Sequence, residues 1–370
     1  MIKVFQVSSD TNIGGAGKCI LTFLKCFNRA EFEVSAVLPK NSLLSPLCEK
    51  EGIKVFEIDA MADKSMDFSA VKKLIKLFKE EKPDIVHAHA SAAAKIAAKL
   101  CGIKVVYTRH SVFEPPKRLT KGIGKAVCGA FNNFTADKII AVAEAAADNL
   151  VKTGVSEKKI EVLLNGVEAL SPWSDEKKSE LKKSFGIADD EAVISIVARL
   201  NYVKGHKYFV EAAEFLKSRG LKAKYLIVGC GDEEENIKKL IAEKNLSDTV
   251  IMTGFLNDVS GILNITDIQV NCSFGTEATS LSLLEGMSLG IPAVVSDFGG
   301  NPGVIKNGGN GFLYPAKDVK KMAECIEELV CDKELYEKMR NNCFDIYERN
   351  FTSEVYTKNI EDVYKSLKKS

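Results

Sequence analysis

The chain alternates short apolar segments with amphipathic ones, and this alternation limits the possible folds more than any other feature of the sequence. Residues 2–9 are typical of a buried strand, whereas residues 68–82 place apolar side chains on one helical face and end before Pro83. Further strand segments in the first half read FEVSAVLP, KVFEID, DIVHAH, KVVYTRH, KIIAVA and IEVLLNGV. Strands that alternate with helices predict an α/β fold, with a parallel sheet covered by helices on both faces.

Residues 169–191 interrupt this pattern. They hold the only tryptophan, a proline and a charge-rich helical segment, a combination typical of a domain junction. The alternation then restarts with AVISIVARL, AKYLIVGC, TVIMTGF, DIQVNCS and PAVVSD, while residues 298–315 suggest only flexible glycine loops. The chain ends in a predicted helix, residues 353–370, with enough apolar positions to dock. We therefore expect two parallel-sheet domains in tandem.

Composition excludes several classes of protein. With 46% hydrophobic and 27% charged residues and a net charge of +1, the 370-residue chain is typical of a soluble globular protein, and nothing favours a nucleic-acid partner. No run approaches the ~18 uninterrupted apolar residues of a spanning helix, and the N-terminus is expected to be a strand, not a signal peptide. We expect a cytoplasmic protein, possible peripheral membrane contact aside.

The cysteines and histidines give no metal signature. Ten cysteines are scattered without a CxxC pair, which predicts small buried hydrophobes in a reducing compartment and no structural zinc. His87 and His89 could share a strand face, but no third ligand lies nearby in the sequence. We therefore predict no metal site.

Several loops that follow strands have features of phosphate binding. Gly14 and Gly15 stand between the first strand and its helix, where backbone N–H groups can approach an anion. The spacing is neither GxGxxG nor that of a P-loop, and any strand–helix turn can use glycine. Arg199 follows a strand and Lys204 precedes a helix, so this pair suits a diphosphate. The alternative for both cations is an ordinary solvated position.

Two glutamates flank a mostly apolar segment near residue 280. Residues 280–289 are expected to form a helix on which Glu285 shares a face with Leu281 and Leu289, so its carboxylate should lie on the apolar side and need a partner. A structural ion pair would explain a single such acid. Glu277, just before the helix, and free N–H groups at the helix start instead favour a sugar that carries a nucleoside diphosphate.

Glu277 and Glu285 enclose seven residues, and in this EX7E spacing the chain resembles the retaining glycosyltransferases of family 4, which have the GT-B fold. The resemblance spans nearly the whole chain. It implies two Rossmann-like domains that face each other across a cleft. Residues 1–168 with 353–370 would bind the acceptor, and residues 169–352 would bind the donor, with the C-terminal helix crossing back to the first domain.

The same resemblance implies roles for individual residues. Glu285 would bind ribose hydroxyls and Glu277 the donor sugar, while Arg199 and Lys204 would neutralise the leaving diphosphate. His110, in YTRHSVF, matches a histidine near the donor sugar, with a satisfied strand-end histidine as the alternative.

Backbone groups complete the implied site. The N–H groups of Thr279, Ser280 and Leu281 would meet the diphosphate, and Gly14 and Gly15 would approach the phosphate or acceptor from the other domain. The sequence departs from the Glu-Gly-Phe-Gly of many relatives, since Ala, Thr and Ser follow Glu277. The glycine loop, which reads Gly-Gly-Ala-Gly, also lacks the acid that often follows it in relatives.

The expected function is retaining transfer of a sugar from a nucleoside-diphosphate sugar, UDP by default, to a hydroxyl of a glycan or lipid-linked acceptor. No cofactor is expected, and since no DxD-type pair suits a divalent ion, transfer should be metal-independent. The glycine spacing typical of NAD-dependent enzymes is absent from this sequence, which disfavours that class. A sugar-nucleotide epimerase and a non-catalytic scaffold are the remaining alternatives. Residues 115–134 mix basic and apolar side chains and suit either an anionic membrane surface or a solvated helix face.

Overall fold

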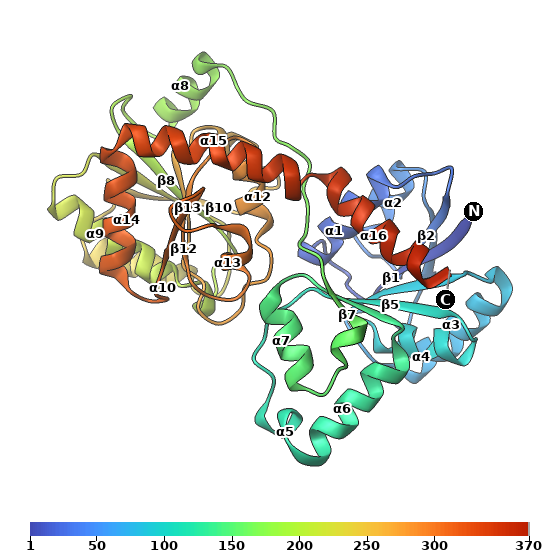
Figure 1. Ribbon diagram of the computed structural model, residues 1–370. Helices are drawn as coiled ribbons and strands as arrows, with labels where there is room; N and C mark the ends of the chain where they lie inside the picture. Colours follow the sequence, from blue (N-terminus) through green and yellow to red (C-terminus); the bar gives the residue numbers. More distant parts are fainter. Residues whose placement is uncertain (369–370) are drawn as a thin grey trace. The chain divides into compact units, whose positions relative to one another are not determined.

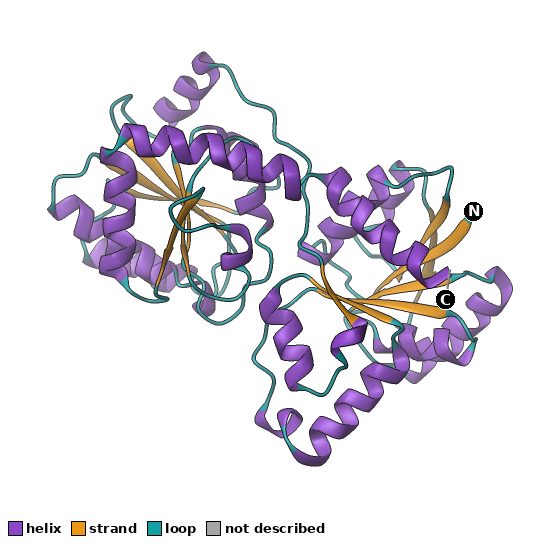
Figure 2. Ribbon diagram, viewed as in Figure 1, coloured by secondary structure: helices purple, strands orange, loops and turns teal. Residues whose placement is uncertain are grey.

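The computed structural model describes residues 1–368 and divides into two compact units (Figure 1). The first unit comprises Met1–Val167 and the segment from Thr352 onward, and the second comprises Glu168–Phe351. The predicted C-terminal helix is α16 (Ser353–Lys368), and the last two residues of that prediction lie outside the described chain. Each unit has its own sheet with helices packed around it (Figure 2).

The first unit is built on a seven-stranded parallel sheet in the order β3-β2-β1-β4-β5-β6-β7. Its strands are β1 (Ile2–Ser8), β2 (Phe32–Pro39), β3 (Lys54–Ile58), β4 (Ile85–His89), β5 (Lys104–Arg109), β6 (Lys138–Ala141) and β7 (Ile160–Val162). Its other helices are α1 (Gly15–Cys26), α2 (Ser45–Lys50), α3 (Phe68–Glu81), α4 (Ala92–Leu100), α5 (Lys117–Thr120), α6 (Gly122–Thr135), α7 (Glu144–Lys152) and the 3₁₀ helix η1 (Glu157–Lys159).

The second unit has a six-stranded parallel sheet in the order β10-β9-β8-β11-β12-β13. Its strands are β8 (Ala192–Val197), β9 (Ala223–Val228), β10 (Val250–Gly254), β11 (Ile268–Asn271), β12 (Ala293–Ser296) and β13 (Gly311–Tyr314). Its helices are α8 (Asp175–Ser184), α9 (His206–Ser218), α10 (Glu234–Glu243), α11 (Ser260–Asn264), α12 (Leu281–Met287), α13 (Asn301–Val304), α14 (Val319–Cys331), α15 (Lys333–Asn350) and the 3₁₀ helix η2 (Tyr202–Lys204).

Capping and burial explain where the elements begin and what they cover. The Asp67 carboxylate accepts hydrogen bonds from the backbone N–H groups of Ser69 and Ala70 at the start of α3. That helix ends at Lys82 in a left-handed conformation, directly before Pro83. The strands are mostly buried along their whole length, as expected for a sheet covered on both faces. The α/β prediction of two parallel sheets is confirmed.

One local prediction is wrong. Residues 311–314, which were expected to lie in a flexible glycine loop, form β13 and pair with β12 at the edge of the second sheet. Four residues after a run of glycines give too short an apolar signal to be told from a loop. The segment 169–191, where the sequence predicted a domain junction, begins next to the first residue of the second unit, Glu168, and is packed within that unit. Trp173 donates its backbone N–H to Asn264 Oδ1 at 2.7 Å, and α8 packs against α11 within the second unit.

The C-terminal helix α16 is an integral part of the first unit. It packs against α1, and Tyr356, Ile360, Val363 and Tyr364 are buried along it. The Glu361 carboxylate accepts the backbone N–H of Asn28 at 2.7 Å. The first sheet therefore depends on residues that come after the whole second unit in the sequence.

Replacing Ile360 by alanine should destabilise the first unit by about 2–5 kcal/mol, because a large side chain that is 1% exposed would leave a cavity. Trp173, the only tryptophan, lies in the second unit, so its fluorescence reports that unit separately. In urea, circular dichroism should show an early transition for Ile360→Ala while the tryptophan transition stays in place. The exposed Lys358→Ala on the same helix is the control. Equal shifts in both signals would contradict this assignment.

Candidate active site

The predicted site residues of the second unit lie at the point where its strand order reverses. From β8 the chain proceeds to β9 on one side and later to β11 on the other, so the carboxyl ends of β8 and β11 diverge. Ligands of open parallel sheets bind at such a point. Arg199 and Lys204 follow β8, and Glu277 lies between β11 and α12. The topology thus collects at one edge groups that are far apart in the sequence.

Glu277 is a buried and fully engaged carboxylate. Its side chain is 8% exposed, and its Oε2 accepts hydrogen bonds from Lys204 Nζ at 2.8 Å, Asn271 Nδ2 at 2.9 Å and Ser273 Oγ at 2.7 Å. Three donors on one oxygen fix the direction of the carboxylate, and none of these bonds uses Oε1. Lys204 also donates to the Thr276 carbonyl at 3.3 Å. The Glu277 carboxylate is thus held in one orientation, and the Lys204 ammonium beside it provides the opposite charge.

Two glycines let separate loops close around this pair. Gly205 follows Lys204 with φ near +72°, and a Cβ there would lie 2.3 Å from the Cys272 carbonyl oxygen. Gly299 has φ near +63°, and a Cβ there would lie 2.3 Å from the Glu277 carbonyl oxygen. Any other residue would be strained and would push the loops apart. The glycines therefore hold the backbone on both sides of the carboxylate in place.

The helix that follows Glu277 differs from the prediction. It runs only from Leu281 to Met287, and Ser280 is its N-cap residue. Residues 288–290 form a turn, and Gly290 has φ near +77°. The fully buried side chains of α12 are Leu283, Leu284 and Met287.

Glu285 lies on the half-buried face with Leu281 and Leu289, so the prediction that its carboxylate sits on the apolar side is wrong. Glu277 is the acid whose side chain is buried. The physical reason is the short length of α12: with seven residues, its orientation is set by packing against α15 and by the Gln269 side chain of β11, which donates to the Ser282 carbonyl at 2.8 Å.

The remaining predicted residues of the second unit have different exposures. The Arg199 side chain is exposed just past β8. Thr279 is buried, Ser280 is half-buried and its hydroxyl lies 3.2 Å from that of Ser282, and Leu281 begins the helix. Among the predicted residues of this unit, Lys204 and Glu277 are joined by a hydrogen bond of 2.8 Å.

In the first unit the strand order reverses between β1 and β4, and of the predicted residues there Gly14 and Gly15 follow β1, whereas His110 follows β5. Gly14 caps α1 and Gly15 begins it, both exposed, with no atom within 4 Å of a Cβ added at either position. His110 follows β5, and its Nε2 lies 2.7 Å from His89 Nδ1. Burial lowers the pKa of His110 to about 4, so its ring is neutral at neutral pH.

Sequence reasoning missed the residues that surround the predicted ones. Asn271 and Ser273 lie two residues apart in a buried segment, so period-two alternation could have placed them on one face with Gln269. His89 shares its strand face with His87, as the sequence suggested, and both rings form hydrogen bonds with polar side chains. Among residues 1–368, no group of three or more His, Cys, Asp or Glu residues could hold a metal ion.

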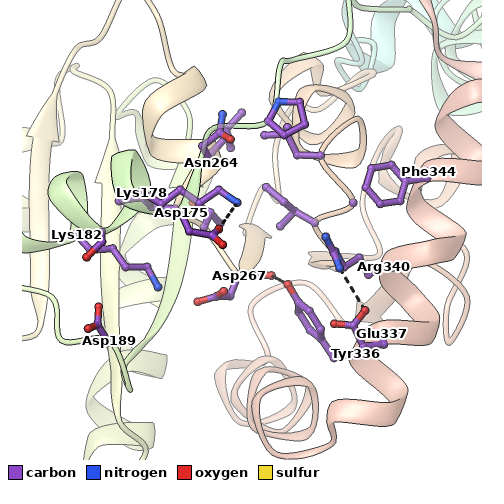
Figure 3. A pocket seen from close by; sticks show the side chains of 18 residues that line it. Asp175, Lys178, Lys182, Asp189, Asn264, Asp267, Tyr336, Glu337, Arg340 and Phe344 are labelled. Carbon is purple, nitrogen blue, oxygen red and sulfur yellow. Dashed lines mark hydrogen bonds and ion pairs between the residues drawn. The ribbon is translucent and has the colours of Figure 1, made fainter.

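A pocket of about 400 Å³ in the second unit lies away from this site (Figure 3). It is lined by residues at the amino ends of the strands, such as Asp267 before β11. Its charged side chains pair with each other across short distances: Lys178 contacts Asp175, and Arg340 contacts Glu337. Parallel sheets bind ligands at the opposite edge, so we do not assign the reaction to this pocket.

Two family models match the chain, one for each unit. The model described as "Glycosyltransferase Family 4" matches residues 13–169, and the model described as "Glycosyl transferases group 1" matches residues 177–344. Together the two matches span most of the sequence and divide it near the boundary between the compact units.

Characterised relatives match over most of their length. The Escherichia coli UDP-Gal:alpha-D-GlcNAc-diphosphoundecaprenol alpha-1,3-galactosyltransferase is 27% identical, with 98% of this chain and 96% of that protein covered. The Acholeplasma laidlawii alpha-monoglucosyldiacylglycerol synthase is 26% identical, with 80% and 79% covered.

Solved structures share the architecture. The crystal structure of Anabaena Alr3699/HepE in complex with UDP superimposes with a TM-score of 0.85 at 20% identity, covering 99% of this chain and all of that one. At this identity the likeness concerns the fold: two parallel-sheet Rossmann-like domains in the GT-B arrangement of elements. Within residues 1–368, no helix is both long and apolar enough to cross a bilayer.

Removing the cation from the buried pair should be costly. Lys204→Met leaves the Glu277 carboxylate buried without its counter-charge, and we expect a loss of about 3–5 kcal/mol in the free energy of unfolding of the second unit, followed by Trp173 fluorescence in urea. Adding Glu277→Gln should restore a large part of this loss, because the buried charge is gone.

The exposed pair between Lys222 and Asp190 provides the control, and Lys222→Met should change stability little. If Lys204→Met behaves like Lys222→Met, the Lys204–Glu277 pair is not desolvated in solution.

Proposed function

Since the chain belongs to the family 4 glycosyltransferases of GT-B fold, we propose that it transfers a sugar from UDP-sugar to a hydroxyl of a glycan or lipid-linked acceptor, with retention of anomeric configuration and without a metal. The observation that carries the proposal is the fixed Glu277 carboxylate, paired with Lys204, at the reversal point of the second sheet. A rigid acid there is suited to accept hydrogen bonds from sugar hydroxyls through Oε1.

We propose that Arg199 is the main residue that stabilises the negative charge on the leaving diphosphate. Lys204 already compensates Glu277 at 2.8 Å, so its net contribution to a bound anion is reduced. Arg199 is exposed beyond β8 and can offer two parallel N–H donors to phosphate oxygens. Backbone N–H groups of Thr279, Ser280 and Leu281 are proposed as further donors. Glu285, half-buried on α12, is proposed to bind the ribose hydroxyls.

The first unit is proposed to bind the acceptor. Gly14 and Gly15 are exposed at the start of α1, where nothing obstructs a close approach to the backbone. His110 is proposed to lie beside the donor sugar. Because its ring is neutral, it adds no positive charge next to a carbon at which positive charge develops.

The proposed reaction breaks the bond between the sugar C1 and the diphosphate oxygen. The acceptor hydroxyl forms the new bond to C1 on the same face that the diphosphate leaves, and a donor phosphate oxygen receives the hydroxyl proton. Arg199, Lys204 and the N–H groups stabilise the negative charge that develops on the diphosphate. No carboxylate acts as a nucleophile in this scheme.

UDP is the nucleotide we propose. The Escherichia coli relative is named for UDP-galactose, and the Anabaena neighbour was solved with UDP. The acceptor class follows from the same comparison, because the Escherichia coli and Acholeplasma relatives are named for a diphosphoundecaprenol-linked sugar and a diacylglycerol lipid.

A panel of UDP-, GDP- and ADP-sugars tests the donor site by thermal shift. We expect a shift with UDP-sugars, and Arg199→Met should reduce donor affinity by about 10- to 100-fold, the loss expected for charge-assisted hydrogen bonds. Glu285→Ala should also weaken binding. Arg219→Met, which removes a remote exposed arginine of the same unit, should leave the shift unchanged.

Product analysis tests the chemistry. NMR of the product should show retained anomeric configuration, and EDTA should leave the rate unchanged. Release of UDP only in the presence of an acceptor would separate transfer from epimerisation. An inverted product, or loss of activity in EDTA that Mg²⁺ restores, would contradict the mechanism. No shift with any sugar nucleotide by folded protein would instead favour a scaffold.

We also propose that α5 and α6 contact an anionic lipid surface. Ile123, Val127 and Phe134 are 83%, 63% and 74% exposed and lie on one face of α6. Exposed basic side chains flank this face at Lys117, Arg118, Lys121 and Lys125. Apolar side chains beside cations suit insertion at an anionic membrane interface.

Flotation tests this surface. Wild type should float with vesicles of phosphatidylglycerol and phosphatidylcholine and less with phosphatidylcholine alone, and Ile123→Asp with Val127→Asp should abolish flotation. Both side chains are exposed, so the melting temperature should stay the same. Phe68→Asp, an equally exposed apolar position on α3, is the matched control and should float as wild type does. A wild type that stays at the bottom with both lipids would exclude membrane contact.

A further inference from the structure

A continuous chain of hydrogen-bonded side chains runs through the first unit, from β5 to the loop that carries His110. Every member except His110 is at most 2% exposed. In order, the members are Thr108, His87, Tyr364, Gln6, His89 and His110. The members other than His110 come from β1, β4, β5 and the C-terminal helix α16. These hydrogen bonds therefore also connect α16 to the sheet.

The amide of Gln6 determines where the proton sits on the two nearest rings. Its oxygen, Oε1, lies 2.8 Å from His89 Nε2, and an amide oxygen can only accept. His89 Nε2 therefore carries the proton, and in a neutral ring Nδ1 is then a lone pair. The contact of 2.7 Å between His89 Nδ1 and His110 Nε2 requires His110 to donate from Nε2. Nδ1 of His110 is left as an acceptor.

The other end of the amide fixes the second half of the chain. Gln6 Nε2 donates to the Tyr364 hydroxyl oxygen at 2.7 Å, so the Tyr364 proton is directed to His87 Nδ1 at 2.6 Å. His87 then donates from Nε2 to Thr108 Oγ1 at 2.6 Å. All three rings thus carry their proton on Nε2, and one amide oriented by one hydroxyl sets the direction of every bond.

We propose that Gln6, oriented by Tyr364, is a positioning residue that locks His89 and His110 in the Nε2–H tautomer and so presents His110 as a hydrogen-bond acceptor. Nδ1 of His110 is a buried atom without a hydrogen-bond partner within the described part of the chain, as expected for a lone pair awaiting a donor. The identity of that donor rests on the proposed function, which supplies a sugar hydroxyl. The positions of the protons on the three rings depend only on the hydrogen bonds described above and not on the proposed function.

Burial keeps all three rings neutral, which the scheme requires. It lowers the pKa of His87 to about 3 and that of His110 to about 4, and it lowers the pKa of His89 well below its usual value. Neighbouring histidines add to this for His87 and His89, because two charged rings in contact would repel each other. The ring centroids of His89 and His110 are 5.0 Å apart.

The chain has only four histidines, so ¹⁵N-histidine labelling of the intact protein gives a readable long-range ¹H–¹⁵N spectrum. At pH 7 the rings of His87, His89 and His110 should each show a protonated Nε2 and a bare Nδ1. Gln6→Met should remove the single tautomer from His89 and His110, and because it also removes the donor that orients the Tyr364 hydroxyl, it should disturb His87 as well. Tyr364→Phe should disturb all three rings.

Tyr356→Phe is the matched control, since it removes the same atom from another buried tyrosine on α16, outside the hydrogen-bonded chain, and should change no ring. Melting temperatures show whether each variant is folded before its spectrum is interpreted. The inference is overturned if wild-type His89 carries its proton on Nδ1, or if folded Gln6→Met leaves the spectra of His89 and His110 as they were.

Steady-state kinetics test whether the tautomer of His110 affects sugar transfer. With the UDP-sugar donor, Gln6→Met should lower kcat about 10-fold, the loss expected from one misdirected hydrogen bond, with a smaller change in the KM of the donor. A purely structural residue would lower the amount of folded protein without this split. Because the spectra need no donor, an ordered tautomer in a protein that transfers nothing would overturn the proposed function alone, and a disordered tautomer in an active enzyme would overturn this inference alone.

Discussion

Parallel pairing is the constraint on which the rest of this structure depends. Each parallel strand must be followed by a crossover to the other end of the sheet, so the carboxyl ends of all strands of a sheet gather at one edge. Where the strand order reverses, between β1 and β4 in one unit and between β8 and β11 in the other, neighbouring loops diverge. The candidate site residues of each unit lie at or near these two places, in loops that are distant from one another in the sequence.

The two units bury polar groups there in different ways. In the second unit a carboxylate is buried beside a cation, and Lys204, Asn271 and Ser273 all donate hydrogen bonds to Glu277. In the first unit the buried groups are imidazoles, which remain neutral and satisfy one another through an amide and a hydroxyl. A carboxylate held by several donors is suited to bind and orient a polar ligand, whereas neutral imidazoles add no positive charge to their surroundings.

The different roles that we propose for Arg199 and Lys204 follow from the same geometry. Sequence reasoning gave Arg199 and Lys204 the same role, as a pair facing a diphosphate. The structure separates them, because Lys204 is held 2.8 Å from Glu277 whereas Arg199 extends from the end of β8. A lysine ammonium is a point charge with three donors and suits a carboxylate and a carbonyl together, while a guanidinium suits paired phosphate oxygens.

The sequence by itself determined the α/β class, the two parallel sheets, the loops that carry the candidate residues and the family, because strand–helix periodicity and residue spacing are local properties of the chain. Tertiary structure decided which acid is buried. Local pattern favoured Glu285, but packing of α12 half-exposes it and encloses Glu277, whose partners lie on β11 and in the loop after β8. It also brought Gln6 and Tyr364, 358 residues apart, into contact between His87 and His89. Hydrogen-bond partners across such separations depend on how the sheet and helices are assembled, and no local pattern encodes them.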